Sequence, residues 1–196
     1  MDRRRKAPHV ACAQQLVNSG LRGKARWLPL WFALLSFPSP SAADPVNSPQ
    51  SGPSAESYIE WHGGTLAPAG TLEIDGRRVD CGQAPTVLDP DYGDFGGAYA
   101  RFLILNPQRF GGLATPVKLW IYSHECAHQA VGADEVKADC IAVLRGRREG
   151  WLTESGLEQI CEFMRPSRQD RQHFCGAQRC ELMQKCFRQD NKPLRR

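Results

Sequence analysis

A repeating pattern of apolar positions and histidines marks one long helix in the second half of the chain. The spacings are four, three, four and three residues, which is one face of an α-helix. The positions are Val117, Ile121, His124, His128 and Val131. Thr115 can cap this helix, Pro116 suits its first position, and Gly132 can end it. The pattern therefore predicts a helix over 115–132 that carries two histidines on its apolar face.

Three further helices are predicted downstream by their end signals. Asp134 can cap a second helix over 135–146. Ser155 and Glu158 have the spacing of a capping box and predict a third helix, which has to stop before the next proline. The segment over 177–188 is expected to form a fourth.

The strand signals lie before the long helix. "TLEIDGRRVD" has strand-forming residues on both sides of Asp75-Gly76, the dipeptide of a tight hairpin. "AYARFLILNP" is a continuous apolar run, ends at Asn106-Pro107 and predicts a single strand. "LDPDYGDFGG", between these, predicts a turn-rich loop. Strands come first and helices follow, so the fold class is predicted as α+β, a small N-terminal β-region followed by a helical region.

The first 43 residues have the order of a signal peptide rather than of a fold. A basic leader precedes the apolar run "WLPLWFALLSF", and "PSPSAA" then offers small residues for cleavage. A membrane anchor is the alternative, but the run has about 11 residues, whereas a spanning helix needs about 20. We therefore predict a cleaved signal over 1–43, a flexible linker over 44–57, a folded domain over 58–188 and a disordered tail over 189–196.

Removal of the leader changes the charge of the protein. The full chain has a formal charge of +4, but the leader holds seven of its 25 Lys and Arg and one of its 21 Asp and Glu. The rest has 18 bases and 20 acids, a net charge of −2. A nucleic-acid partner needs a basic patch on the fold, and only the short "NKPLRR" end is basic. We expect no nucleic-acid partner and no stable membrane span after cleavage; the oligomeric state stays open.

Seven of the eight cysteines follow the leader, which indicates a disulfide-bonded protein in a secreted or periplasmic location. The odd number predicts at least one cysteine that is free or paired between chains. Zinc ligation by the last three is the rival interpretation, but Cys175-x4-Cys180-x5-Cys186 lacks the tight pairing of a zinc ribbon.

The motif His124-Glu125-x-x-His128 carries the candidate chemistry. Residues four apart on a helix point the same way, so both imidazoles can reach one zinc ion. Glu125 lies about 100° around the helix, beside the metal, where it can take a proton from water. The alternatives are an exposed helix and a hydrogen-bonded buried histidine pair. Because both histidines share the apolar stripe, a buried pair needs a partner, and a metal is the simplest one.

A third ligand is expected from the next helix. The short turn after His128 predicts a tight helical hairpin that brings Glu135 near His128 and Asp139 near His124. One carboxylate can ligate zinc while the other holds the far nitrogen of a histidine. Geometry at this level does not assign the two roles.

H-E-x-x-H followed by E-x-x-x-D resembles the gluzincin metallopeptidases, the thermolysin-like clan. The resemblance implies Glu135 as the third zinc ligand and Asp139 as the support of a zinc histidine. The connector of six residues between His128 and Glu135 departs from thermolysin itself and is more similar to small, minimal gluzincin domains.

"RQHFCGAQRC" is similar to the T-H-P-x-x-x-x-R segment of CAAX-type and heat-shock-type membrane metallopeptidases. That resemblance implies that His173 and Arg179 lie near the active site as oxyanion stabilisers. Gln172 and Phe174 replace the Thr and the Pro of the pattern. The alternative is a surface His and a surface Arg. Together the two resemblances span about 60 residues.

Two structural expectations surround the metal helix. "RFLILNP" could be the edge strand along which a peptide substrate lies, or a buried central strand. Cys126 lies between the two histidines and so points away from the metal. It could bridge to Cys140 across the hairpin or to the C-terminal segment, and neither thiolate is expected to bind zinc.

The predicted function is an exported zinc metallopeptidase that hydrolyses peptide bonds in a peptide or protein substrate. His124, His128 and Glu135 would bind Zn²⁺, and Glu125 would be the general base for the zinc-activated water. Two rival predictions are an inactive zinc-containing binding domain and a disulfide-stapled structural domain without metal.

Overall fold

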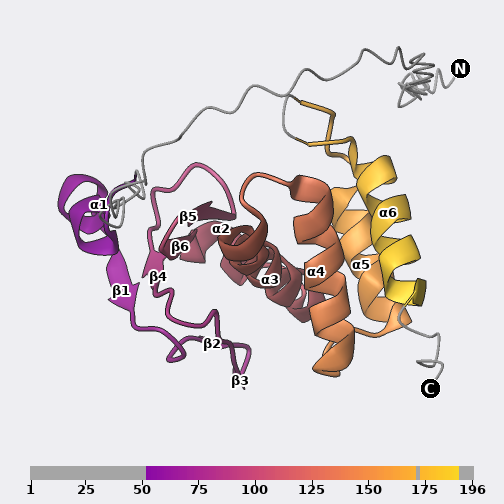
Figure 1. The fold of residues 1–196 in the computed structure, drawn as a ribbon, viewed down its shortest axis with the longest axis horizontal. Helices are drawn as coiled ribbons and strands as arrows, with labels where there is room; N and C mark the ends of the chain where they lie inside the picture. Colours follow the sequence, from indigo (N-terminus) through magenta and orange to yellow (C-terminus); the bar gives the residue numbers. More distant parts are fainter. Residues whose placement is uncertain (1–51, 171–172, 190–196) are drawn as a thin grey trace, which may run out of the picture. The chain divides into compact units, whose positions relative to one another are not determined.

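The computed structural model describes residues 52–170 and 173–189 (Figure 1). The predicted signal peptide, most of the predicted linker and most of the predicted tail lie outside these residues. The helices are α1 (Ala55–His62), α2 (Pro107–Gly111), α3 (Thr115–Val131), α4 (Glu135–Arg148), α5 (Glu154–Met164) and α6 (Gly176–Gln189). The strands are β1 (Thr65–Ala67), β2 (Glu73–Ile74), β3 (Arg77–Arg78), β4 (Thr86–Leu88), β5 (Gly96–Tyr99) and β6 (Phe102–Leu105).

Four of these strands form a mixed sheet in the order β1-β4-β6-β5. β1 and β4 are antiparallel, β4 and β6 are parallel, and β5 and β6 are antiparallel. β6 therefore lies inside the sheet, and β5 forms one of its edges. Of the two places left open for "RFLILNP", the central one is confirmed and the edge one is wrong.

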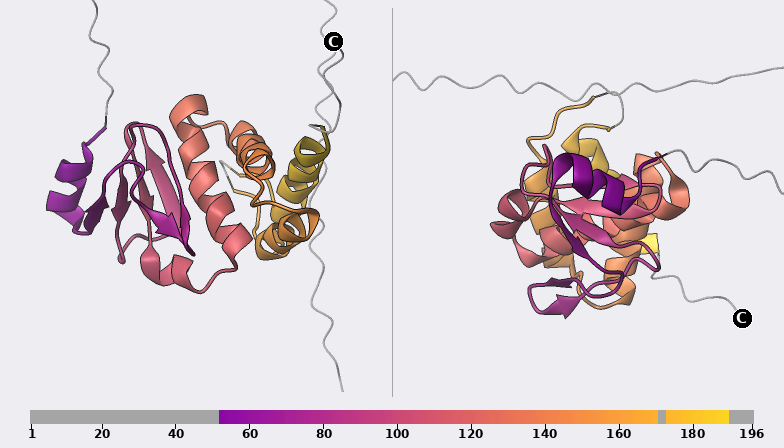
Figure 2. Two further views of the ribbon diagram at one scale, coloured as in Figure 1. Left: turned by 90° about the horizontal axis from the view of Figure 1, so that it is seen from below. Right: turned by 90° about the vertical axis from the view of Figure 1, so that its left-hand side faces the viewer.

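β6 separates two apolar clusters, and its side chains alternate between them. Phe102 and Ile104 pack with Tyr58 of α1 on one face, while Leu103 and Leu105 pack in the larger cluster under α3 on the other. Because both faces are covered, the strand is apolar along its whole length. Figure 2 shows the resulting succession of α1, sheet, α3 and the remaining helices.

The α+β class is confirmed, and the helical hairpin α3–α4 follows the strands as expected. The predicted hairpin is also present: β2 and β3 pair across Asp75 and Gly76, which have φ values of 48° and 79°. Positive φ at both positions is typical of a tight type I′ turn, which explains the Asp-Gly pair.

Several predicted boundaries are wrong. The linker ends early, because Ala55 starts α1 and is buried. The run "AYARFLILNP" is not one strand, because the chain turns after Tyr99 and separates β5 from β6. Helix α3 is capped by Ala114, which makes no side-chain cap, while Thr115 donates to Asp75.

For the other helices, one predicted cap is confirmed, one is wrong, and one helix is slightly longer than predicted. Asp134 caps α4 as predicted and accepts from the Lys137 N–H. Thr153, rather than the predicted Ser155, caps α5 by accepting from the Gly156 N–H. Helix α6 covers the predicted segment with one extra residue at each end.

Three disulfides join pairs of described residues: Cys81–Cys126, Cys140–Cys186 and Cys161–Cys180. Cys126 therefore bridges neither to Cys140 nor to the C-terminal segment, and both predicted partners are wrong. None of the described cysteines of the full chain is free. The unpaired cysteine expected after removal of the leader stays a prediction. Within the described part of the chain, no helix is long and apolar enough to span a membrane.

Candidate metal centre

The candidate metal centre lies in the hairpin of α3 and α4. The C-cap of α3 is Gly132, whose N–H donates to the His128 carbonyl and whose φ of 61° reverses the chain with little strain. Asp134 then caps α4 two residues later. This short turn fixes the two helices side by side, so the first turn of α4 faces the histidines of α3.

Three ligand atoms converge in the hairpin. The ligand atoms of His124, His128 and Glu135 all lie within 4.8 Å of one another. The two Nε2 atoms are 3.1 Å apart, and the Glu135 carboxylate lies 3.1 Å from His124 Nε2 and 3.6 Å from His128 Nε2. Two imidazole nitrogens and one carboxylate oxygen are a donor set that zinc accepts in catalytic sites.

Each histidine is oriented by its other nitrogen. His128 Nδ1 faces the Gly132 carbonyl, which can only accept, so Nδ1 carries the proton. His124 Nδ1 is buried and lies 3.0 Å from Asp139 Oδ1, an ion-pair distance without good hydrogen-bond geometry, and the nearby carboxylate favours a proton there. Both Nε2 lone pairs are thereby left for a metal, as is usual for histidine ligands.

The two carboxylates differ in position. Glu135 faces the Nε2 atoms, whereas Asp139 faces the far nitrogen of His124. The arrangement agrees with Glu135 as ligand and Asp139 as support.

One buried oxygen supports the fit of a metal ion. Glu135 Oε2 is buried and makes no hydrogen bond of good geometry, although His124 Nε2 and His173 Nε2 lie at ion-pair distances of 3.1 and 3.2 Å. A buried carboxylate oxygen without a hydrogen bond needs a cationic partner, which is either a protonated histidine or a metal ion. A bound metal ion would satisfy this oxygen and take the place of the proton on the imidazole.

The local charges shift the pKa values of the cluster. Burial by itself lowers the pKa of His124, but the carboxylates of Asp139 and Glu135 outweigh it and raise that pKa to about 9. Contact with Glu135 raises the pKa of His128. Burial would raise the pKa of Glu135, but the contacts with the neighbouring histidines outweigh this effect and hold the pKa well below its usual range. The cluster therefore stays anionic at Glu135 under all ordinary conditions.

Glu125 lies beside the cluster, as the helix geometry predicts. It lines two adjoining hollows, one of about 230 Å³ and one of about 500 Å³, together with His124. Burial raises the pKa of the Glu125 carboxyl, while the neighbouring histidines lower it. A carboxylate with a raised pKa, next to a metal and open to a cavity, can accept a proton from water.

Arg179 is near the site but does not face the metal. Its Nε and Nη2 donate to Asp139 Oδ2 and Oδ1, each at 2.7 Å, and the side chain is 8% exposed. The guanidinium therefore binds Asp139, and it also lines the smaller hollow. The oxyanion role of Arg179 stays a prediction. The alternative of a surface arginine is wrong.

His173 lies at the opening of the site. Its Nε2 is 3.2 Å from Glu135 Oε2, and its Nδ1 lies 3.2 Å from each carboxylate oxygen of Asp170. It lines both hollows. The structure thus brings His173 to the cluster, as predicted, and adds Asp170 as the residue that orients it. No spacing in the sequence pointed to Asp170.

Two aromatic residues of the site were not anticipated. Trp120 lies one turn before His124, with the ring centroids 5.6 Å apart. Tyr92, from the loop before β5, lines the larger hollow, and burial together with the Glu125 charge raises its pKa to about 12. The helical stripe could have located Trp120, because it lies four residues before His124. Tyr92 depends on a loop path that periodicity does not give.

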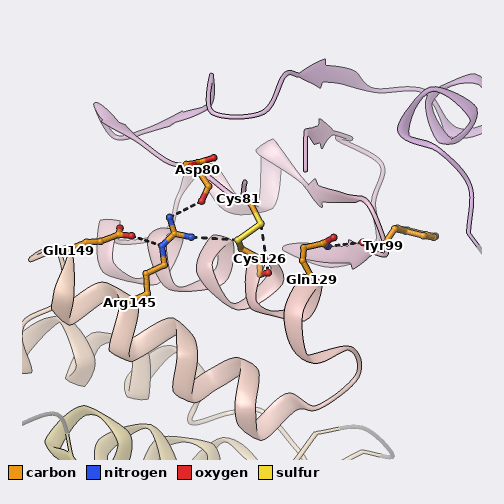
Figure 3. Close-up of a disulfide and its surroundings, with 7 residues drawn as sticks. All are labelled: Asp80, Cys81, Tyr99, Cys126, Gln129, Arg145 and Glu149. Atoms are coloured by element: carbon orange, nitrogen blue, oxygen red, sulfur yellow. Dashed lines mark hydrogen bonds and ion pairs between the residues drawn. A yellow bond between two sulfur atoms is a disulfide. The ribbon is translucent and has the colours of Figure 1, made fainter. Parts of the chain in front are cut away.

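The other side of α3 is fixed to its surroundings by the Cys81–Cys126 disulfide (Figure 3). Arg145 of α4 donates to the Asp80 carbonyl at 2.7 Å and lies 3.5 Å from Cys126 Sγ. Gln129 donates to the Tyr99 carbonyl at 2.7 Å and so ties the end of β5 to α3. Cys126 points away from the metal cluster, as expected, and its disulfide removes it as a ligand.

Comparison with known proteins identifies no relative: no sequence family, no curated protein and no solved structure matches the chain. The resemblance of the H-E-x-x-H and E-x-x-x-D residues to gluzincins stays a prediction. The function is therefore inferred from the chemistry of the site itself.

Proposed function

We propose that the protein is a zinc-dependent peptidase of gluzincin type. The observation that carries this proposal is the convergence of His124, His128 and Glu135 within 4.8 Å, with Glu125 of the same helix facing the adjoining cavity. Ligation alone would not need Glu125, whereas hydrolysis needs a base at that place.

His124, His128 and Glu135 would hold the ion. When bound, zinc supplies a Lewis acid that polarises a carbonyl and makes water more acidic. Glu125 takes the proton of the attacking water and gives it to the leaving amine. His173, held by Asp170 at the opening, would turn its Nε2 from Glu135 to donate a hydrogen bond to the carbonyl oxygen as it becomes negative.

The edge strand β5 supports a peptide as substrate. The Asn106 N–H donates to the Phe95 carbonyl, which makes these residues a hydrogen-bonded pair of the β5–β6 ladder. The alternation of an antiparallel ladder then directs the backbone groups of Gly96 and Ala98 to the open edge. A peptide can pair with them as an added strand, and the larger hollow runs from this edge to the metal cluster.

Glycine at position 96 keeps that edge close to the site. A Cβ there would lie 3.1 Å from Glu125 Cγ and from Ile121 Cγ2. Any side chain would press on the general base or on its helix. The glycine therefore lets a bound peptide pass next to Glu125.

The smaller hollow supports a preference for one large apolar side chain beside the cleaved bond. Its walls include Phe95, Trp120, Phe163 and Phe174, and His124 and Glu125 border it. Its volume of about 230 Å³ is below the range of about 300–1,000 Å³ for pockets that hold whole drug-sized ligands. A single aromatic or branched side chain fits this size and lining.

The location follows from the same proposal. The disulfides agree with an oxidising compartment, and together with the predicted signal peptide they favour a secreted or periplasmic peptidase.

The test is made on the oxidised protein without residues 1–43. Zinc is counted by mass spectrometry after dialysis, and hydrolysis of a peptide library is followed for the unaltered protein and for Glu125→Gln. We expect one zinc in both proteins and hydrolysis in the first alone, with a loss on the order of 100-fold or more in kcat for the variant.

Other outcomes assign the rival functions. Zinc in both proteins without hydrolysis in either would identify an inactive zinc-containing binding domain. A folded protein that takes up no zinc and ignores chelators would sink the peptidase proposal and leave a disulfide-stapled structural domain.

A further inference from the structure

His124 and three neighbouring side chains form a closed ring of contacts. Arg179 of α6 binds Asp139 of α4 through two hydrogen bonds of 2.7 Å, and Asp139 Oδ1 lies 3.0 Å from His124 Nδ1. The guanidinium carbon of Arg179 also lies 5.4 Å from the ring centre of Trp120. That ring in turn packs 5.6 Å from the ring of His124.

We propose that Arg179 is a positioning residue of the metal centre: through Asp139 and Trp120 it fixes the orientation of His124 and thereby sets the metal affinity. The inference rests on the metal-binding part of the proposed function and not on peptide hydrolysis. It gives Arg179 a role different from the oxyanion role that the sequence resemblance implied.

The two supports of His124 act on different parts of its ring. Asp139 lies at the Nδ1 edge, and the Trp120 ring packs against the imidazole at an angle of 43°. Arg179 contacts both supports at once. A planar guanidinium is suited to this, because it can donate in its plane to a carboxylate while its face stacks on an aromatic ring. A lysine at this position would keep the positive charge but could not donate two parallel hydrogen bonds to the carboxylate.

Because its charged side chains are buried, the ring of contacts is not explained by a contribution to the free energy of folding alone. Arg179, Asp139 and His124 are 8%, 2% and 5% exposed. A buried ion pair is expensive to desolvate and often contributes little net stability compared with apolar packing. Its value is a fixed geometry, and the group whose geometry it fixes is a metal ligand.

Disulfides flank both members of the ion pair. Cys140 follows Asp139 and bonds to Cys186 of α6, and Cys180 follows Arg179 and bonds to Cys161 of α5. Helix α6 is therefore covalently held to α4 and α5 next to the contact between Arg179 and Asp139. The C-terminal helix, which supplies no ligand, is in this way coupled to the metal centre.

The experiment measures zinc dissociation constants by competition with a chelator, on oxidised protein. Outer-shell partners of metal ligands typically change the affinity by about 10- to 100-fold. We expect Arg179→Gln to weaken zinc binding by about tenfold, at the lower end because it acts through a second residue, and Arg179→Lys to lie between it and the unaltered protein.

The matched control is Arg147→Gln. The guanidinium carbon of Arg147 lies 5.2 Å from the ring centre of Phe187, and Arg147 also donates a hydrogen bond to the Phe187 backbone carbonyl. This contact joins α4 to α6 away from the candidate metal ligands. We expect this control to lower the melting temperature without changing the zinc affinity. An Arg179→Gln protein that melts earlier but binds zinc as tightly as the control would overturn the proposal.

A double-mutant cycle with Asp139→Asn tests the route. If Arg179 acts through Asp139, the double variant binds zinc about as weakly as the weaker single variant. Additive losses would show an independent action and contradict the route. The visible spectrum of the cobalt-substituted Arg179→Lys protein gives a second readout: a changed ligand geometry alters it, and an unchanged spectrum with unchanged affinity also overturns the proposal.

The outcomes separate this inference from the proposed function. A protein that binds zinc but hydrolyses no peptide leaves the positioning role testable and sinks the peptidase. A protein that binds no zinc overturns both.

Discussion

The metal centre has two unlike walls. On the side of α4 and α6, Asp139, Arg179 and Trp120 hold His124 through buried polar and ring contacts. On the side of β5, the wall consists of a glycine and the backbone of an edge strand, next to a cleft of about 500 Å³. The side chains of the first wall restrict the movement of His124. The second wall leaves space beside the metal cluster and has backbone N–H and C=O groups at the open edge of the sheet.

This difference matches the two tasks that the proposed metallopeptidase would have to perform. Metal ligands need fixed orientations, which buried hydrogen-bonded partners provide. A peptide needs an accessible edge with free hydrogen-bonding groups, which fixed side chains would block. The predictions below alter one wall at a time, and each expects the other wall's task to persist.

The largest effect is expected from the ligand on the fixed wall. Glu135→Gln replaces an anionic ligand by a neutral amide, so we expect zinc affinity to fall by more than about 100-fold, beyond the usual loss from outer-shell changes. Chelator competition measures it. Glu158→Gln, an exposed glutamate of α5, is the control and should bind zinc normally. Retention of zinc by Glu135→Gln would assign the third ligand elsewhere.

The open wall is closed by Gly96→Val. Its side chain would press on Glu125 and Ile121, so kcat/KM for peptides should fall by about 100-fold, the scale of a displacement of about 1 Å. One zinc per chain should remain. Gly93→Val, where a Cβ meets no atom within 4 Å, should keep its activity. Equal activity of the two variants would show that substrate does not pass along β5.

The smaller hollow, which both walls line, gives a smaller effect. Phe163→Ala removes one wall, which Phe95 contacts edge-on at 5.1 Å. We expect kcat/KM to drop by about 10-fold for peptides with a large apolar residue beside the cleaved bond. Peptides with alanine at that place serve as the internal control and should be cleaved at the same rate. A uniform loss over both substrates would contradict a pocket for one side chain.

The sequence located the candidate ligands more completely than the residues that orient them. Periodicity located His124, Glu125 and His128, because one helix sets their relation. The short connector brought Glu135 and Asp139 to the same cluster, but only the folded hairpin shows which of them faces the Nε2 atoms. Local geometry is encoded within a few residues and can be derived from their spacing.

Contacts between distant segments could not be derived in the same way. Arg179 reaches Asp139 across 40 residues, and its target depends on how α6 packs on α4. Cysteine spacing gave no pairing, and Cys126 bonds to Cys81, 45 residues earlier. The prediction of one strand over "AYARFLILNP" is wrong for another reason: the turn at Ala100 and Arg101 contains no glycine or proline to mark it.

The fixed wall also carries opposing charges whose contribution depends on pH in the metal-free protein. His124 has its pKa raised from 6.5 to about 9, so its contribution to stability is complete below pH 6.5 and is lost as the pH rises toward 9. Glu135 has its pKa lowered, so its contribution is present above its ordinary value of 4.5 and is lost in acid. Metal-free protein should therefore be most stable in the mildly acidic range.

Zinc should remove the alkaline loss, because a ligating His124 is neutral and gains nothing from a proton. The gap in melting temperature between the zinc-loaded and the metal-free protein should widen from pH 6.5 to 9, by on the order of 5 °C. Calorimetric scans of both forms measure it. Metal-free His124→Gln lacks the titrating group and should show no alkaline decline over this window. A gap that stays constant would mean that the charges of Asp139 and Glu135 do not hold His124 in place without the ion.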